Sequence, residues 1–180
     1  MGEQKLLLPV GKRPMVRRVV DAALNSRAAR TIVVVGHEAD AVLAALDGAP
    51  VIVTINAEYA DGMSTSLKAG LRASAGTCDG VIFLLGDQPY VTATLIDEMI
   101  DRFASTSAAV VRPAFGGRPA NPVLIGSELF AEILEQSGDV GGREIVERHS
   151  DQVSLVSVDD PRVCVDVDSP QDYEATRESI

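Results

Sequence analysis

Short apolar runs alternate with amphipathic stretches along the chain. The runs are rich in Val, Ile and Leu, which is typical of strands buried on both faces of a parallel sheet. In the stretches between them, apolar residues recur at helical spacing with charged residues on the opposite side. The pattern predicts strands over residues 31–36, 50–56, 80–86, 107–115, 153–158 and 163–167. It predicts helices over residues 14–25, 37–46, 66–75, 92–103, 127–136 and 143–149, and a last helix after Ser169.

This alternation of strands and helices predicts an α/β fold with a doubly wound, mostly parallel sheet. The 180 residues are enough for one hydrophobic core, and only 4% of them are aromatic, so the core must be built from aliphatic side chains. We therefore expect one domain over residues 1–180. In such sheets ligands bind beyond the carboxyl ends of the strands, which directs the search for function to the loops there.

The charge of the chain limits what these loops can bind. The formal net charge is −10 and no basic stripe offsets it, so nucleic acid is not an expected partner. An acidic protein that handles a nucleotide needs a divalent cation, because the triphosphate is itself an anion. Two cysteines without metal-ligand spacing argue against a zinc site or a disulfide framework. No apolar stretch is long enough to span a membrane, and a cytoplasmic location is the default expectation.

Three aspartates in two of the loops are candidate metal ligands. Asp87 follows the most apolar run, GVIFLLG, at the point where that strand leaves the core, although a turn or helix cap explains this aspartate equally well. Asp166 and Asp168 are two positions apart, so in an extended segment their carboxylates lie on one side, where Mg²⁺ would relieve their repulsion. The same stretch is also a good helix start, with Asp168 or Ser169 as N-cap.

Two further segments are suited to a nucleotide. The stretch DGMSTSLKAGL (residues 61–71) places Gly62 and three hydroxyl residues just before a helix. Free N–H groups and hydroxyls at a helix start suit an anion or the polar edge of a base, although capping alone accounts for one serine. The hydroxyl residues are Ser64, Thr65 and Ser66. The opening MGEQK, with Gly2 and Lys5, looks like the end of a phosphate-binding loop, in which a lone ammonium steadies a phosphate; simple solvation of the lysine is the alternative.

Taken in order, six segments resemble the molybdenum cofactor cytidylyltransferase-like branch of the nucleotidyltransferases, a family that also contains molybdopterin guanylyltransferases. The segments are MGEQKLLLPVGKRPM, DGMSTSLKAGL, LLGDQPYV, GGRPANPVLI, SGDVGGREIV and VDVDSPQDY. The resemblance implies a Rossmann-like three-layer α/β/α sandwich of the nucleotide-diphospho-sugar transferase type. It also implies Mg²⁺-dependent transfer of a nucleotidyl group, CMP from CTP, to a molybdopterin-type acceptor with release of pyrophosphate.

The same resemblance implies roles for particular residues. Asp87 corresponds to the Mg²⁺-binding aspartate, with Asp166 or Asp168 as its acidic partner. Lys5 corresponds to the lysine that ends the signature loop and offsets charge on the leaving pyrophosphate, so Lys5 and Asp87 are the implied catalytic residues. The implied nucleotide-binding residues are Gly2, Lys5, Gly62, Ser64, Ser66, Gly86 and Asp87. The implied acceptor-side residues are Asn121, which stands where many relatives have His, together with Asp139 and Arg143.

Two alternative functions stay open at this stage. One is a nucleotidyltransferase of the same fold that uses GTP or another acceptor. The other is a non-catalytic protein that holds the molybdenum cofactor and delivers it to a molybdenum hydroxylase. The family signature, Leu-Ala-Ala-Gly-x-Ser-x-Arg-Met-Gly-x-x-Lys, follows a strand, and this sequence starts at its Met. We expect that Met1 is an internal methionine of a longer protein; the alternative is a truncated chain with impaired nucleotide binding.

Overall fold

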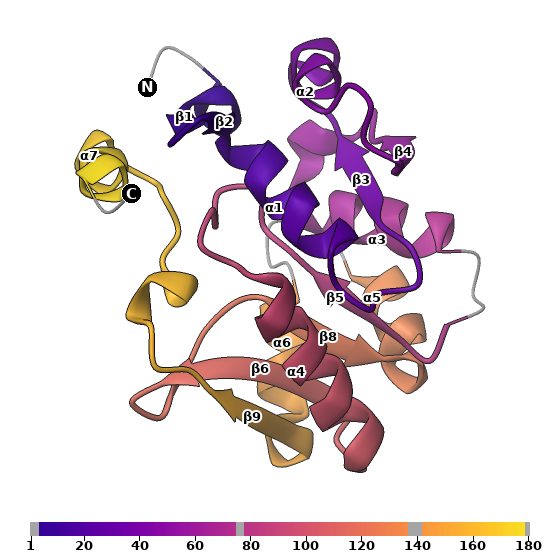
Figure 1. Cartoon of the computed structure of the whole chain (residues 1–180). Helices are drawn as coiled ribbons and strands as arrows, with labels where there is room; N and C mark the ends of the chain where they lie inside the picture. Colours follow the sequence, from indigo (N-terminus) through magenta and orange to yellow (C-terminus); the bar gives the residue numbers. More distant parts are fainter. Residues whose placement is uncertain (1–3, 75–77, 137–141, 179–180) are drawn as a thin grey trace.

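The computed structural model of the chain describes residues 4–74, 78–136 and 142–178, in which strands and helices alternate (Figure 1). The strands are β1 (Pro9–Val10), β2 (Arg13–Pro14), β3 (Ile32–Val35), β4 (Ile52–Ile55), β5 (Gly80–Phe83), β6 (Val110–Phe115), β7 (Arg118–Pro119), β8 (Val123–Gly126) and β9 (Val153–Ser157). The α-helices are α1 (Met15–Leu24), α2 (Ala39–Ala45), α3 (Met63–Ala73), α4 (Ala93–Ser105), α5 (Phe130–Glu135), α6 (Arg143–Arg148) and α7 (Pro170–Glu178). Short 3-10 helices include η1 (Lys5–Leu7), η2 (Tyr59–Asp61), η4 (Ser150–Gln152) and η5 (Pro161–Cys164).

The larger sheet contains β5, β8, β6, β7 and β9. Strand β8 is antiparallel to both β5 and β6, whereas β9 is parallel to β6. Strands β5, β6 and β9 therefore run in one direction, and β8 and the two-residue β7 oppose them. Strands β3 and β4 form a second, parallel pair with Ile32 opposite Ile52. The expected α/β fold with a mostly parallel central sheet is confirmed.

Helices cover both faces of the larger sheet, which gives three layers. Val110 and Val111 are consecutive in β6 and therefore point to opposite faces. Val110 packs in a buried cluster with residues of α3, α5 and α6, and Val111 packs in another with residues of α4. The α-helices thus bury their apolar sides against a sheet of aliphatic residues, as the low aromatic content predicts.

Two expected elements differ from the structure. Residues 123–126 form β8, although the sequence analysis predicted no strand there. The strand expected over residues 163–167 is wrong, because its first half belongs to η5 and its second half pairs with no strand. The backbone N–H of Val167 donates instead to the carbonyl oxygen of Asp87 at 3.0 Å. β9 already pairs with β6 along its whole length, and the segment after β9 is held by other contacts, among them this bond to the loop that follows β5.

A small buried cluster joins the two ends of the chain. Val10, Met15 and Val167 are completely buried in it, and Tyr173 of α7 packs against them. The hydroxyl of Tyr173 also donates to the carbonyl oxygen of Pro9 at 2.8 Å. The N-terminal hairpin is thereby fixed beside the segment that carries Asp166 and Asp168.

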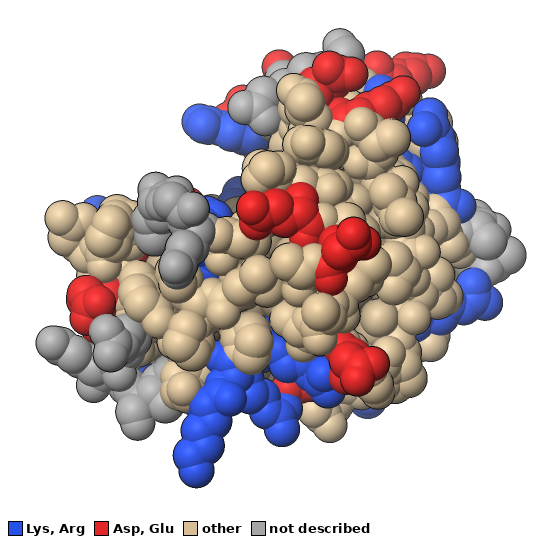
Figure 2. All heavy atoms as spheres, turned by 90° about the horizontal axis from the view of Figure 1, so that it is seen from above, with Lys and Arg blue, Asp and Glu red and all other residues tan. Residues whose placement is uncertain are grey.

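The surface carries no continuous basic stripe on the face shown in Figure 2. There, Lys and Arg side chains lie in separate groups near the edges, and acidic side chains are interspersed with large uncharged areas. Within the described ranges, every helix is too short or too polar to cross a membrane.

Candidate functional site

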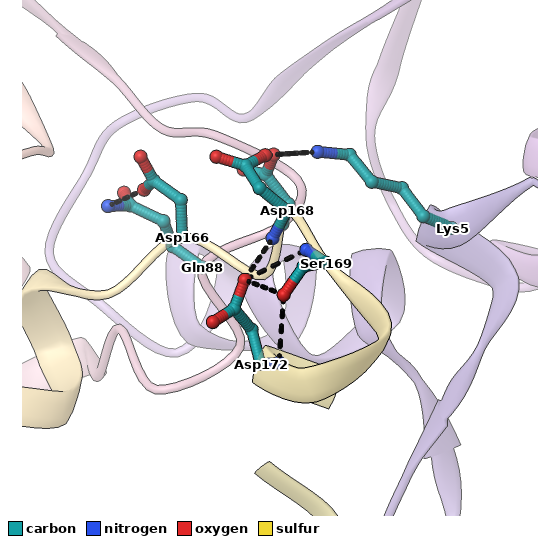
Figure 3. A network of polar contacts seen from close by, with 7 residues as sticks. Lys5, Gln88, Asp166, Asp168, Ser169 and Asp172 are labelled. Carbon is teal, nitrogen blue, oxygen red and sulfur yellow. Dashed lines mark hydrogen bonds and ion pairs between the residues drawn. The ribbon is translucent and has the colours of Figure 1, made fainter. Parts of the chain in front are cut away.

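A lysine and two aspartates from distant parts of the sequence meet beyond the carboxyl end of β5. The ammonium of Lys5, the first residue of η1, donates to Oδ2 of Asp87 at 2.7 Å and to Oδ1 of Asp168 at 2.8 Å. Figure 3 shows the Lys5 side chain extended across to Asp168 from a separate segment. The sequence predicted a functional role for all three residues, and the structure brings them together.

Close packing at Gly86 places Lys5 over the end of β5. A side-chain carbon added at Gly86 would lie 3.2 Å from a methyl group of Leu6, which is tighter than almost all real contacts. The absence of a side chain at Gly86 therefore lets η1 approach the loop after β5. Leu6 packs against Gly86 next to Asp87, and the nucleotide contact expected for Gly86 stays a prediction.

Asp166 is held beside this cluster by Gln88. The side-chain amide of Gln88, which is only 1% exposed, donates to Oδ1 of Asp166 at 2.6 Å. Burial, and then the negative charge of Asp87, raise the pKa of Asp166 above its ordinary value. Burial alone would lower the pKa of Lys5, but its hydrogen bonds to Asp168 and Asp87 outweigh this and raise it. The sequence identified Gln88 only as a turn residue, and its position directly after Asp87 was the available signal.

Asp168 is oriented by the start of α7. Oδ2 of Asp172 accepts hydrogen bonds from the backbone N–H of Ser169 at 2.8 Å and from its hydroxyl at 2.7 Å, and it lies 3.3 Å from the backbone nitrogen of Asp168. The Ser169 hydroxyl in turn accepts from the backbone N–H of Asp172 at 3.2 Å. This reciprocal pattern is a capping box, so the predicted N-cap at Ser169 is confirmed. Figure 3 shows Asp172 below the backbone of Asp168 and Ser169.

Stability contributed by Asp172 is expected to depend on pH. The hydrogen bond from the side chain of Ser169 lowers the pKa of Asp172, so its contribution is fully present above the ordinary carboxyl pKa and is lost as the pH falls through the lowered value. We expect Asp172→Asn to melt a few degrees below the wild type at pH 7, with a difference that shrinks below about pH 4. Thermal melts from pH 7 to pH 3 check this, with the exposed Asp151→Asn as control. A difference that is the same at every pH would contradict the prediction.

The three hydroxyl residues lie in the first turn of α3, which begins at Met63, and not before the helix as the sequence predicted. Ser64 is 1% exposed, and its hydroxyl has no hydrogen-bond partner among the described residues. Asn56, which follows β4, donates from its side-chain nitrogen to Thr65 at 2.8 Å and to Ser66 at 3.0 Å. Gly62 has a φ of 110°, a conformation that favours glycine, and it precedes the first residue of the helix. The sequence analysis missed Asn56, which fixes two of the three hydroxyls.

An open depression lies beside this helix start. Its volume is about 390 Å³, and it is lined by Tyr59, Ala60, Asp61, Gly62 and Met63. Tyr59 and Met63 are 46% and 48% exposed. Exposed apolar surface at the start of a helix is suited to a ligand with a planar ring and polar edges.

The expected acceptor-side residues are not connected to the cluster by any contact in the described ranges. Asn121 precedes Pro122 in the loop between β7 and β8. Arg143 begins α6 on the surface, and its guanidinium pairs with Glu147 at 2.8 Å. Asp139 and Gly2 lie outside the described residues. The roles predicted for these four positions therefore stay predictions.

The residues present fit a divalent cation that is shared with phosphate. Within the described ranges, no three acidic, His or Cys side chains are placed to hold an ion together. However, Oδ1 of Asp87 is buried without a hydrogen-bond partner among those residues, and Asp168 lies on the other side of the same ammonium. One or two carboxylates completed by phosphate oxygens and water is the usual way in which proteins hold Mg²⁺ beside a nucleotide.

The three-layer α/β fold, with acidic side chains beyond the carboxyl end of β5, is the Rossmann-like fold of the nucleotide-diphospho-sugar transferase type. The chain belongs to the MobA-like NTP transferase family, whose domain model matches residues 1–153. Among solved structures, it is similar to the manganese complex of Rv0371c from Mycobacterium tuberculosis, with a TM-score of 0.80 and 28% identity over 98% of this chain and 92% of that one.

Two curated relatives differ in how much of their length this chain covers. Nicotine blue oxidoreductase from Paenarthrobacter nicotinovorans is 26% identical and is matched over 92% of this chain and 83% of its own length. The bifunctional protein GlmU from Sphingopyxis alaskensis is 33% identical over 68% of this chain. The chain spans only 26% of that GlmU, which is therefore a much longer protein.

Proposed function

We propose that this chain is a divalent-metal-dependent nucleotidyltransferase, which moves CMP from CTP to a molybdopterin-type acceptor and releases pyrophosphate. The observation that carries the proposal is the cluster of Lys5, Asp87 and Asp168, in which a buried carboxylate oxygen of Asp87 has no partner among the described residues. Family membership supports nucleotidyl transfer, and the manganese bound in the structure of Rv0371c supports a divalent metal. We propose that one domain of residues 1–180 carries the activity.

Each part of the site has a role in this proposal. Ser64 and Ser66 at the start of α3 would contact the cytosine ring, and Lys5 would neutralise the phosphates that leave. Asp87, with Asp166 or Asp168, would hold Mg²⁺. The ion would supply positive charge that stabilises the negative charge developing on the phosphate oxygens.

The reaction needs no nucleophile from the protein. An oxygen of the acceptor phosphate forms a bond to the α-phosphorus of CTP, while the bond from that phosphorus to the β-phosphate oxygen breaks and pyrophosphate leaves. The protein contributes position and charge, because it must hold the two phosphates in line. Asn121, Asp139 and Arg143 are the residues that we propose for the acceptor side.

Pyrophosphate release measured over a panel of substrates tests this function. CTP, GTP, ATP and UTP are each supplied with Mg²⁺ or Mn²⁺ and with either molybdopterin or a sugar 1-phosphate. We expect CTP with molybdopterin to exceed the other nucleotides by about tenfold or more, because a site with hydroxyls that pair with one base rejects bases that leave those hydroxyls unpaired. Turnover with GTP or with the sugar phosphate would show that the proposed substrates are wrong. Binding of molybdopterin without any turnover would favour a non-catalytic protein that delivers the cofactor.

A further inference from the structure

The ammonium of Lys5 lies where two carboxylates converge. Asp87 and Asp168 come from opposite halves of the chain, and Lys5 contacts both at 2.7 and 2.8 Å. Asp166 lies two residues before Asp168, and Gln88, which directly follows Asp87, holds the Asp166 carboxylate beside the cluster with a hydrogen bond of 2.6 Å. One lysine thus compensates three acidic side chains, so the cluster is short of positive charge.

A buried carboxylate oxygen shows that this compensation is incomplete. Oδ1 of Asp87 has no hydrogen-bond partner among the described residues, although Oδ2 of the same group contacts Lys5. Gln88 is 1% exposed, and its Oε1 also has no partner among those residues while its amide holds Asp166. Buried oxygens without donors are costly, and a cation with several coordination positions satisfies them better than one ammonium.

The Lys5 side chain is also able to move away from the two carboxylates. Its side chain is 32% exposed, and the Asp168 side chain that it contacts is 70% exposed. A lysine carries its charge on a flexible stem of four carbons, so the ammonium can exchange a carboxylate for another anion without movement of η1. The phosphates of a nucleotide would offer such an anion.

We propose that Lys5 is a built-in counter-ion that competes with the divalent cation for Asp87 and Asp168, so that the metal enters together with the nucleotide and not before it. This inference rests on the proposed function. In the protein without ligand, Lys5 keeps the carboxylates together and opposes binding of free metal. When the metal–nucleotide complex arrives, the phosphates draw the ammonium away, and the carboxylates become available to the ion.

Binding of Mn²⁺ alone tests the competition directly. Free Mn²⁺ is measured by electron paramagnetic resonance during titration of the wild type, Lys5→Met and Lys12→Met. Lys12 is exposed in the turn between β1 and β2, so its substitution matches the change in net charge. We expect Lys5→Met to bind Mn²⁺ about tenfold more tightly than the wild type, because a positive charge beside the ion is removed. Lys12→Met should bind like the wild type. Lys5→Gln repeats the test with a polar side chain, and circular dichroism verifies that each variant is folded.

A second titration separates this inference from the proposed function. With CTP and Mn²⁺ together, the wild type should bind more tightly than Lys5→Met, because the lysine now contacts phosphate. If Lys5→Met and Lys5→Gln bind free Mn²⁺ no better than the wild type, the counter-ion role is wrong, whatever the nucleotide does. If both bind Mn²⁺ more tightly but no nucleotide binds to any variant, the counter-ion role stands and the proposed nucleotidyl transfer fails.

Discussion

Asp87→Asn is expected to lower the rate of pyrophosphate release by at least about a hundredfold while the protein stays folded. Asparagine has the same shape as aspartate but no charge. The substitution therefore removes the negative charge and replaces one of the two oxygens that we propose as metal ligands with an NH2 group, and it leaves the loop after β5 in place. The carbonyl oxygen of Asp87, which accepts from the backbone N–H of Val167, is not changed by the substitution.

Two measurements on Asp87→Asn distinguish a catalytic defect from a structural one. Its melting temperature should lie within a few degrees of the wild type. The substitution loses one ion pair with Lys5, but it also relieves repulsion among three neighbouring carboxylates, and the two effects oppose each other. Asp151→Asn, an exposed aspartate in η4, should keep full activity. If folded Asp87→Asn kept full activity, Asp87 would not be a metal ligand and the proposed mechanism would be wrong.

Much of the fold could be predicted because aliphatic runs and amphipathic stretches have different periods. Strand β8 could not, since residues 116–122 before it contain the glycines and prolines that indicate a loop. The segment 163–167 shows the opposite error. Its alternation would place Val163, Val165 and Val167 on one side, but Val163 and Val167 are buried whereas Val165 is 43% exposed. Alternation cannot reveal whether a neighbouring strand has a free edge, and here β9 occupies that edge of β6.

The charged residues of the candidate site were predictable from the sequence, but the residues that hold them in place were not. Carboxylates after apolar strands and a lone lysine are visible in the sequence. Gln88 contacts Asp166 and Asn56 contacts Thr65, and no spacing in the sequence predicts either contact; only the position of Gln88 directly after Asp87 could have indicated it. Asp172 is the exception, because Ser-x-x-Asp before a helix indicates a capping box, as Ser169 and Asp172 confirm.

Met15→Ala is expected to damage both stability and ligand binding, because Met15 packs between the two segments that form the site. Its side chain is completely buried with Val10 and Val167, and Val167 lies between Asp166 and Asp168. Truncation of a buried methionine to alanine costs about 2–5 kcal/mol of unfolding free energy, through lost transfer energy and a cavity. The cavity would loosen the hairpin against the acidic segment, so Lys5 and Asp168 would no longer be held together.

Met99→Ala is the matched control for this prediction. Met99 is also completely buried, but it lies in α4 and packs with Leu95 and Val111 in a different buried cluster, which does not contain Val10 or Val167. Chemical denaturation should show a similar loss of stability for both variants. Binding of Mn²⁺ with CTP, measured by calorimetry at a temperature where both are folded, should weaken severalfold for Met15→Ala and stay near the wild-type value for Met99→Ala. Equal weakening in both would mean that the site responds to general stability. A defect in Met15→Ala alone would show that packing between the chain ends positions the lysine and the carboxylates.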